Sequence, residues 1–185
     1  TGGMGAYAPA PLVTKDILHR VEQEIIVPVL DAMREEDRTY RGLLYCGIML
    51  TDDGPKVVEF NCRFGDPETQ AVLPLVKCDW YEIFKACAEG DLHPGIQFEI
   101  DKGYCVSVIL ASKGYPGNYE KGKIITGIED VEHRHSNIDV YHSGTVLDED
   151  DRLLTNGGRV CAVTAWSDNL ADAIADAYLV VGDIH

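Results

Sequence analysis

The stretch Val57–Thr69 decides how this chain is interpreted, and it reads VVEFNCRFGDPET. Side chains alternate between the two faces of a strand, so Glu59, Asn61 and Arg63 are expected on one face, with apolar neighbours on the other. A carboxylate beside an amide offers the oxygen ligands that Mg²⁺ prefers, and a nearby arginine can hold phosphate or carboxylate oxygens. The same alternation is also typical of an ordinary hairpin with a polar solvent face, so spacing alone leaves both interpretations open.

Around this stretch the sequence predicts a β-hairpin. Leu43–Leu50 and Lys56–Asn61 are both strand-like. Between them, Asp52-Asp53-Gly54-Pro55 is a strong turn signal. The paired carboxylate and amide are therefore expected near the end of the second strand of the hairpin.

Helices are predicted on both sides of the hairpin. Thr14 can cap a helix with apolar residues at helical spacing, in which Pro28 should cause a kink or a break. Downstream, Gln70–Leu75 and Trp80–Ala88 are apolar and helical, and Gly90 closes the second of them. Strands and helices are thus mixed in the first half of the chain.

From about residue 96 the pattern changes to short β-like runs separated by turns. These runs are Tyr104–Ala111, Lys123–Gly127, Asp139–Tyr141, Gly144–Leu147, Arg152–Thr155 and Arg159–Trp166. Asn156-Gly157 is the strongest hairpin-turn signal. A final helix, capped by Ser167, has one apolar face made of Leu170, Ala173, Ile174, Ala177, Tyr178 and Val181. The chain is predicted to contain two units, residues 1–95 and 96–185, joined by the linker Leu92–Gly95.

Composition and charge exclude several classes of protein. The chain has 185 residues, 45% of them hydrophobic and 25% charged, as in ordinary globular proteins rather than disordered ones. Sixteen basic and 31 acidic side chains give a net charge of −15. Such a chain has no overall positive field to attract nucleic acid or an anionic membrane, so neither is expected as a partner. No apolar run is long enough for a membrane span, and no signal-like segment is visible.

The six cysteines indicate a reducing compartment rather than a metal knuckle. No two of them form a Cys-x-x-Cys pair. Cys46, Cys62, Cys87 and Cys105 lie in apolar stretches and are interpreted as small reduced core residues of a cytoplasmic protein. Among the histidines, only His133-x-His135 has a spacing like that of metal ligands, and it is interpreted as part of a solvated loop.

The longer string Glu59–Gln70 closely resembles the metal-binding segment of the glycinamide ribonucleotide synthetases, which are ATP-grasp ligases of purine synthesis. Glu-x-Asn occurs across many ATP-grasp enzymes, whereas the continuation Arg-Phe-Gly-Asp-Pro-Glu-Thr-Gln is specific to this family. The resemblance runs in order over nearly the whole chain. It also includes the segments Thr1–Tyr7, Gly47–Gly54, Gly114–Gly117 and Thr155–Val160.

The resemblance implies an α/β (α+β) chain, in which the C-terminal half of an ATP-grasp domain precedes a small β-rich C-terminal domain. The implied reaction is the ATP-dependent ligation of glycine to 5-phosphoribosylamine, giving glycinamide ribonucleotide, ADP and phosphate through a glycyl phosphate intermediate. Glu59 and Asn61 are implied to hold Mg²⁺ or Mn²⁺, with ATP as co-substrate. Arg63 is implied to be catalytic, stabilising the transferring phosphate or the glycine carboxylate.

The same resemblance implies substrate-binding residues in three further segments. One is the glycine loop with Thr1, Gly2, Gly3 and Gly5, whose backbone N–H groups can approach an anion closely. Asp66 and Glu68 are implied to orient the loop or the substrate amine, or else to form a structural salt bridge. Arg159 is implied to lie near the ribose phosphate, with a solvated strand residue as the alternative.

Other features of the sequence point to a part of a larger enzyme. Many ATP-grasp enzymes carry another acidic metal ligand on the preceding strand, where Gly47-Ile48-Met49 supplies none. The family's glycine-rich lid and nucleotide-clamping lysines are not found in these 185 residues, so the chain alone is expected to be an inactive fragment that binds ATP weakly. The alternatives are another ATP-grasp carboxylate-amine ligase, a biotin carboxylase, or a non-catalytic folded fragment. The sequence does not predict an oligomeric state.

Overall fold

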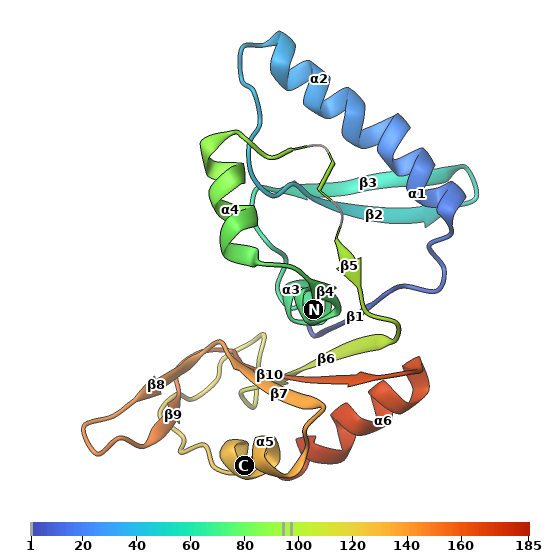
Figure 1. The fold of residues 1–185 in the computed structure, drawn as a ribbon. Helices are drawn as coiled ribbons and strands as arrows, with labels where there is room; N and C mark the ends of the chain where they lie inside the picture. Colours follow the sequence, from blue (N-terminus) through green and yellow to red (C-terminus); the bar gives the residue numbers. More distant parts are fainter. Residues whose placement is uncertain (1, 94, 97) are drawn as a thin grey trace. The chain divides into compact units, whose positions relative to one another are not determined.

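The computed structural model describes residues 2–93, 95–96 and 98–185 and divides the chain into two compact units (Figure 1). Unit 1 consists of Thr1–Pro9, Asp66–Val76 and Ile100–His185, and unit 2 consists of Ala10–Gly65 and Lys77–Glu99. The units are interleaved along the chain, whereas the sequence predicts two consecutive halves. The boundary near residue 95 stays a prediction, and its linker residue Pro94 lies outside the described residues.

Unit 1 is built on a four-stranded sheet in the order β1-β6-β10-β7. The strands are β1 (Gly5–Ala8), β6 (Tyr104–Ala111), β10 (Arg159–Ser167) and β7 (Ile138–His142). Every neighbouring pair is antiparallel, which is typical of an α+β fold. Gly5 lies opposite Val108, so the first residues of the chain belong to the same sheet as its second half.

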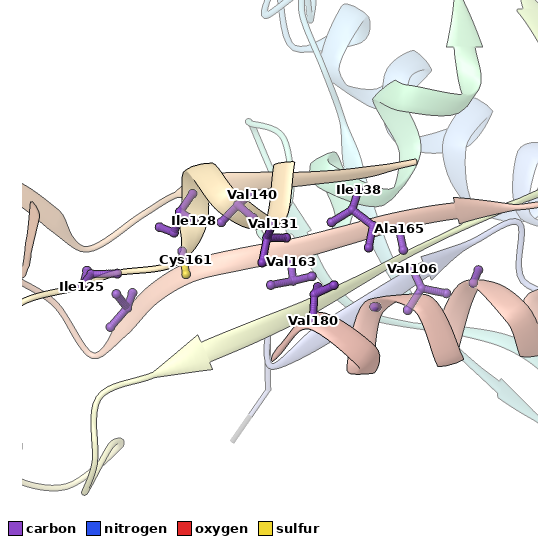
Figure 2. Close-up of a cluster of buried hydrophobic side chains, with 13 residues drawn as sticks. Val106, Ile125, Ile128, Val131, Ile138, Val140, Cys161, Val163, Ala165 and Val180 are labelled. Carbon is purple, nitrogen blue, oxygen red and sulfur yellow. The ribbon is translucent and has the colours of Figure 1, made fainter. Parts of the chain in front are cut away.

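Helices cover both faces of this sheet. The helices α5 (Ile128–Arg134) and α6 (Leu170–Val181) pack on one face, where Figure 2 shows Val106, Val163 and Val180 within a single apolar cluster. On the other face, α3 (Glu68–Val72) continues into the 3₁₀ turn η2 (Leu73–Leu75) and packs against β1 and β6. There the buried Thr164 hydroxyl donates to Ser107 Oγ at 3.1 Å, which satisfies a polar pair inside the layer.

Two predictions for the second half of the chain are wrong, and one helix was missed. Lys123–Gly127 is not a strand but contributes only one isolated bridge, Ile124 to Leu154, and the helix α5 was not predicted. Asn156-Gly157 is not a hairpin turn, because β9 (Leu153–Thr155) pairs with β8 (Thr145–Leu147) and not with β10. The β8–β9 hairpin is closed instead by the residues between Leu147 and Leu153.

The last helix, α6, differs from the prediction in its N-cap residue and in the face that it buries. Its N-cap is Asn169, whose side chain accepts from the Asp172 N–H, and not Ser167. Ala173, Ala177 and Val180 are buried, whereas Ile174 and Tyr178 remain 41% and 61% exposed. The buried face is therefore rotated toward the alanines, whose small side chains let the helix approach the sheet closely.

Unit 2 begins with a long helical segment made of α1 (Lys15–Val21), the π-helical η1 (Glu22–Ile26) and α2 (Val27–Glu35). The predicted cap is confirmed: Thr14 Oγ1 accepts from the Ile17 N–H at 3.3 Å. Pro28 does not break the helix. It lies in the first turn of α2, directly after the π-helical residues, where the wider turn replaces the α-type bonds that the proline ring would disturb.

The predicted hairpin of unit 2 is confirmed as β2 (Tyr45–Thr51) and β3 (Gly54–Asn61). Its pairing shifts by one residue between Gly47 and Ile48, where Gly47 faces Glu59 and Ile48 faces Val57. Val58 is the extra residue of this bulge, so the alternation of side chains is reset directly before Glu59.

The helix α4 (Trp80–Glu89) completes unit 2, as predicted, with an Asp79 cap and Gly90 at φ +75°. Phe64, Trp80, Phe84 and Phe98 form a chain of ring contacts with centroids 5.4–6.5 Å apart. The short strands β4 (Val76–Lys77) and β5 (Glu99–Ile100) lie where the chain passes between the units. None of the helices in the described ranges is both long and apolar enough to cross a membrane.

The cysteines differ between the units. Of the four predicted core cysteines only Cys105 is buried. Cys161, which was not among those four, is also buried, and both residues belong to unit 1. Cys46, Cys78 and Cys87 of unit 2 are partly buried, and Cys62 is exposed because it follows the last residue of β3. All six are free thiols.

Candidate functional site

The predicted metal ligands lie side by side at the end of β3 in unit 2. The Asn61 side-chain NH₂ donates to Glu59 Oε1 at 2.9 Å, so both side chains project from the same face of the hairpin. Gly47 lies directly opposite Glu59, and a Cβ at that position would come within 3.1 Å of Glu59 Cγ. The glycine at position 47 therefore leaves room for the Glu59 side chain on this face of the hairpin.

The chemistry of this pair fits a hard divalent cation. A carboxylate and an amide offer oxygen ligands, and Mg²⁺ normally completes its octahedral shell with water and substrate phosphate. To bind a metal ion, Asn61 would turn its amide so that Oδ1, rather than its NH₂, lies beside Glu59. In the described residues no group of three or more His, Cys, Asp or Glu side chains is arranged for a metal ion, so this pair supplies two ligands only. His133 and His135 therefore do not belong to a metal-binding group among the described residues. The interpretation of His133 as part of a loop is wrong, because His133 lies in α5 and its ring is hydrogen-bonded to the Glu129 carbonyl.

Arg63 does not continue the alternation of β3. The strand ends at Asn61, and the chain bends at Cys62 and Arg63. The Arg63 guanidinium donates to the Phe64 carbonyl at 2.8 Å. The prediction that Arg63 shares the strand face of Glu59 and Asn61 is therefore wrong, because the strand is too short to carry it.

In unit 1, Arg159 connects three segments that are far apart in the sequence. Its Nη1 donates to the carbonyls of Gly3 and Asp66 at 2.9 and 2.8 Å, and its Nη2 donates to Asp66 Oδ2 at 2.9 Å. Three predicted substrate-binding residues thus meet at one guanidinium, which we call the Arg159 clamp (Gly3, Asp66 and Arg159). The Arg159 side chain is 27% exposed, so part of it can still be reached by a ligand.

Asp66 is held from both sides. Its Oδ2 pairs with Arg159, and its Oδ1 accepts from Gln70 Nε2 at 3.0 Å. The salt-bridge interpretation of Asp66 is the one that the structure bears out. Gln70 was not predicted as a site residue, although it closes the string that carries the family resemblance. Glu68 is the first residue of α3.

The glycine loop is fixed by the clamp rather than open along its length. Gly3 has φ +72°, and a Cβ there would lie 2.6 Å from Arg159 Nη1, so only glycine fits under the guanidinium. Gly2 has open space where a side chain would be. Gly5 is the first residue of β1 and lies within the sheet, so its predicted place in an anion-binding loop is not supported. Thr1 lies outside the described residues.

A groove of about 1120 Å³ lies elsewhere in unit 1, beside Ile109–Lys113 and the end of α6. Its lining includes Lys113, Lys123 and Tyr119, and Lys123 pairs with Glu120. None of the predicted site residues that the structure describes lines it. The groove therefore does not coincide with either the Glu59–Asn61 pair or the Arg159 clamp.

Family comparisons agree with the order of these segments. Residues 1–69 match the phosphoribosylglycinamide synthetase ATP-grasp (A) domain, and residues 105–185 match the phosphoribosylglycinamide synthetase C domain. The first match contains the Glu59–Asn61 pair, and the second contains Arg159.

Proteins with similar sequences are named as phosphoribosylamine–glycine ligases or as trifunctional proteins of purine biosynthesis. The chain is 46% identical to a phosphoribosylamine–glycine ligase of Rhodopirellula baltica over 100% of its own length and 42% of that protein. It is 49% identical to the trifunctional purine biosynthetic protein adenosine-3 of Bos taurus, over 96% of the chain and 17% of that protein. The chain therefore spans less than half of the relatives that it matches.

Solved structures show the same fold. Phosphoribosylamine–glycine ligase from Thermotoga maritima superposes on 100% of the chain and 44% of that protein, with a TM-score of 0.82 and 31% identity. A biotin carboxylase from Campylobacter jejuni superposes on 98% of the chain and 39% of that protein, with a TM-score of 0.66 but only 16% identity. The second likeness concerns the fold alone.

Proposed function

Because the chain belongs to the phosphoribosylglycinamide synthetase family, we propose that the complete protein ligates glycine to 5-phosphoribosylamine with cleavage of ATP. The products are glycinamide ribonucleotide, ADP and phosphate, in purine synthesis. The observation that carries the proposal is the hydrogen-bonded Glu59–Asn61 pair on β3, the two residues that the family resemblance implies as metal ligands. This activity is proposed for the whole protein, and the 185-residue chain by itself is expected to be inactive.

The proposed reaction has two displacements. A glycine carboxylate oxygen attacks the γ-phosphorus of ATP, ADP leaves, and a glycyl phosphate is formed. The amine nitrogen of phosphoribosylamine then attacks the carbonyl carbon of this anhydride, phosphate leaves, and the nitrogen loses a proton. Such chemistry depends mainly on positioning and on neutralising charge.

The residues of β3 serve the first displacement in this proposal. Glu59 and Asn61 hold Mg²⁺ or Mn²⁺, which when bound neutralises charge on the triphosphate oxygens. Arg63 turns its guanidinium from the Phe64 carbonyl to the transferring phosphate or the glycine carboxylate. The side chain is exposed, so this change requires only that one hydrogen bond to a backbone carbonyl be exchanged.

The Arg159 clamp serves the phosphorylated substrate in this proposal. The three bonds of the clamp use three of the five N–H groups of a guanidinium. The remaining N–H groups can meet ribose phosphate oxygens while Asp66 and the Gly3 carbonyl keep the side chain in place. Asp66 acts here as a positioning residue, since Arg159 and Gln70 occupy both of its carboxylate oxygens.

The direct test is ADP release by the full-length enzyme that contains this chain, with each substrate omitted in turn. We expect release to depend on both glycine and phosphoribosylamine. ADP release that does not depend on glycine, or that another carboxylic acid supports equally, would favour a different ATP-grasp ligase.

We also propose a cytoplasmic location, supported by six free thiols of the kind found in reducing compartments.

A further inference from the structure

Two segments that resemble the family, Gly114–Gly117 and Thr155–Val160, meet beside the Arg159 clamp. A Cβ built on Gly158 would overlap the Tyr115 ring at Cδ2 and Cε2. The ring therefore occupies the space that a side chain at position 158 would take. Gly158 directly precedes Arg159, so the ring packs against the backbone from which the guanidinium extends.

Hydrogen bonds hold the same backbone on the Tyr115 side. The Ser112 hydroxyl donates to the Gly157 carbonyl at 2.7 Å, and the Ser112 N–H donates to the Gly158 carbonyl at 2.8 Å. The Tyr115 N–H donates in turn to the Ser112 carbonyl at 3.0 Å. Ser112 and Tyr115 thus form one local turn against Gly157 and Gly158.

A second segment, at Gly144, also contacts this backbone. The Gly144 N–H donates to the Arg159 carbonyl at 3.0 Å, and the Gly144 carbonyl accepts from the Asn156 N–H at 2.7 Å. A Cβ on Gly144 would lie 2.5 Å from the Arg159 carbonyl oxygen. The backbone of residues 156–159 is therefore held by two segments, one at Ser112 and Tyr115 and one at Gly144.

Close packing, and not backbone conformation, explains the glycines of this segment. Neither Gly157 nor Gly158 lies in the left-handed region. A hairpin turn of the Asn-Gly type would require φ above zero, which is why that prediction fails here. What Gly158 provides is room for an aromatic ring one residue before the arginine.

We propose that Tyr115 is a positioning residue for Arg159. The ring seated on Gly158 fixes the Cα of Arg159, so that one guanidinium can reach Gly3 and Asp66 and still face a phosphate. Three bonds of 2.8–2.9 Å from one planar group tolerate little displacement of its backbone. This inference rests on the proposed function, because it concerns the phosphorylated substrate that Arg159 is proposed to bind.

The test replaces the ring in the full-length enzyme. In Tyr115→Leu the flat contact with Gly158 is lost, and we expect the KM for phosphoribosylamine to rise about tenfold while the KM for ATP changes by less than about twofold. Gly158→Ala, which displaces the ring from the other side, should have the same selective effect. Tyr115→Phe keeps the ring and should restore the parental KM.

Two matched controls make the same kinds of substitution outside the Tyr115–Gly158 contact. Tyr178→Leu removes an exposed tyrosine of α6, and Gly182→Ala adds a methyl group where nothing lies within 4 Å. Both should leave the KM values unchanged. In an Arg159→Lys background, Tyr115→Leu should raise the KM for phosphoribosylamine no further, because the group that it positions is already altered.

The outcomes separate this inference from the proposed function. If Arg159→Lys itself leaves the KM for phosphoribosylamine unchanged, the phosphate role of Arg159 is wrong. If Arg159→Lys raises this KM but Tyr115→Leu and Gly158→Ala do not, the positioning role of Tyr115 is wrong. Equal effects on the KM values of ATP and phosphoribosylamine would indicate a general loss of structure and would also overturn it. If Tyr115→Leu fails to fold, Gly158→Ala and Tyr115→Phe decide the question in the same way.

Discussion

Unit 1 and unit 2 hold their polar site residues in different ways. In unit 1, Arg159 is the first residue of β10, in a sheet that is packed on both faces, and it makes three hydrogen bonds to residues of its own unit. In unit 2, Glu59 and Asn61 are bonded to each other at the end of a two-stranded hairpin. Of the buried hydrophobic residues in the described part of the chain, all but Ile25 belong to unit 1.

This difference separates two kinds of functional residue. A residue that also holds segments together contributes to both stability and binding, and its loss affects both. A residue on an exposed strand face can be replaced with little effect on packing, so its loss affects the chemistry alone. The contrast therefore predicts which variants are inactive but folded and which are both weakened and less stable.

The largest effect is expected for Glu59→Gln in the full-length enzyme. Loss of the carboxylate charge should lower turnover by about 100-fold through weaker metal binding, without changing the melting temperature. Asn61→Ala should behave similarly. Raising Mg²⁺ should recover part of the loss. The matched control is Asp53→Asn, which makes the same charge change at the hairpin turn and should leave turnover unaltered. Parental activity of Glu59→Gln at ordinary Mg²⁺ would remove the metal assignment.

Arg63→Lys should have the next largest effect. It keeps a positive charge but loses the planar fork, so the single-turnover rate should fall by a few tens of fold while ATP binding changes little. Arg38→Lys is the control, because Arg38 belongs to the same unit and its side chain is 74% exposed. A single-turnover rate equal to that of the parent would show that Arg63 is only a surface charge.

Arg159→Lys tests the other side of the comparison. Lysine lacks the planar guanidinium that bonds the Gly3 carbonyl and both Asp66 acceptors at once, so the free energy of unfolding should fall by about 1–3 kcal/mol. The KM for phosphoribosylamine should also rise, by about tenfold. Arg152→Lys in the β8–β9 hairpin should do neither, because the Arg152 side chain is 55% exposed and all of its ion pairs are to neighbouring residues of the same turn. A stable Arg159→Lys enzyme would contradict the structural role of the clamp.

The smallest effects concern the thiols, which also differ between the units. Burial raises the pKa of Cys161 to about 11, and burial together with the nearby Asp139 charge raises the pKa of Cys105 to about 12. An unfolded thiol ionises near pH 9, so the contribution of these two thiols to the unfolding free energy of unit 1 should be constant below that pH and should fall as pH rises from 9 toward 12. Cys161→Ala should weaken this dependence on pH.

A thiol reagent at neutral pH gives a second measure of the same contrast. In the native protein it should modify Cys62 first, because Cys62 is exposed, and should spare Cys105 and Cys161. Modification of the unit 1 thiols at a rate equal to that of Cys62 would show that the core of unit 1 opens readily.

Local signals predicted the parts of the fold that are made by neighbours in the sequence. The β2–β3 hairpin, β6 and the Thr14 and Gly90 helix boundaries were all visible, because turns, alternation and caps act over a few residues. The helix α5 was missed, since only Ile128 and Val131 are buried along its seven residues and give little periodicity.

Long-range contacts explain what the sequence could not predict. The pairing of Gly5 with Val108 joins residues about a hundred positions apart, and no local pattern reports it. Likewise, Gly3, Asp66 and Arg159 were proposed as site residues only through the family resemblance, and their meeting at one guanidinium is visible only in the structure. Gln70 and Ser112 were missed because their roles depend on those contacts.

The most direct test of the contrast between the units is native-state hydrogen exchange on the 185-residue chain, resolved by residue. Amides of β6 and β10 in unit 1 should be the most protected, because both faces of that sheet are packed. Amides of β2 and β3 in unit 2 should exchange much faster, since few of their apolar side chains are buried. Equal protection of the two sets of strands, or stronger protection of β2 and β3, would show that unit 2 is at least as stable as unit 1 and that the contrast between the units is wrong.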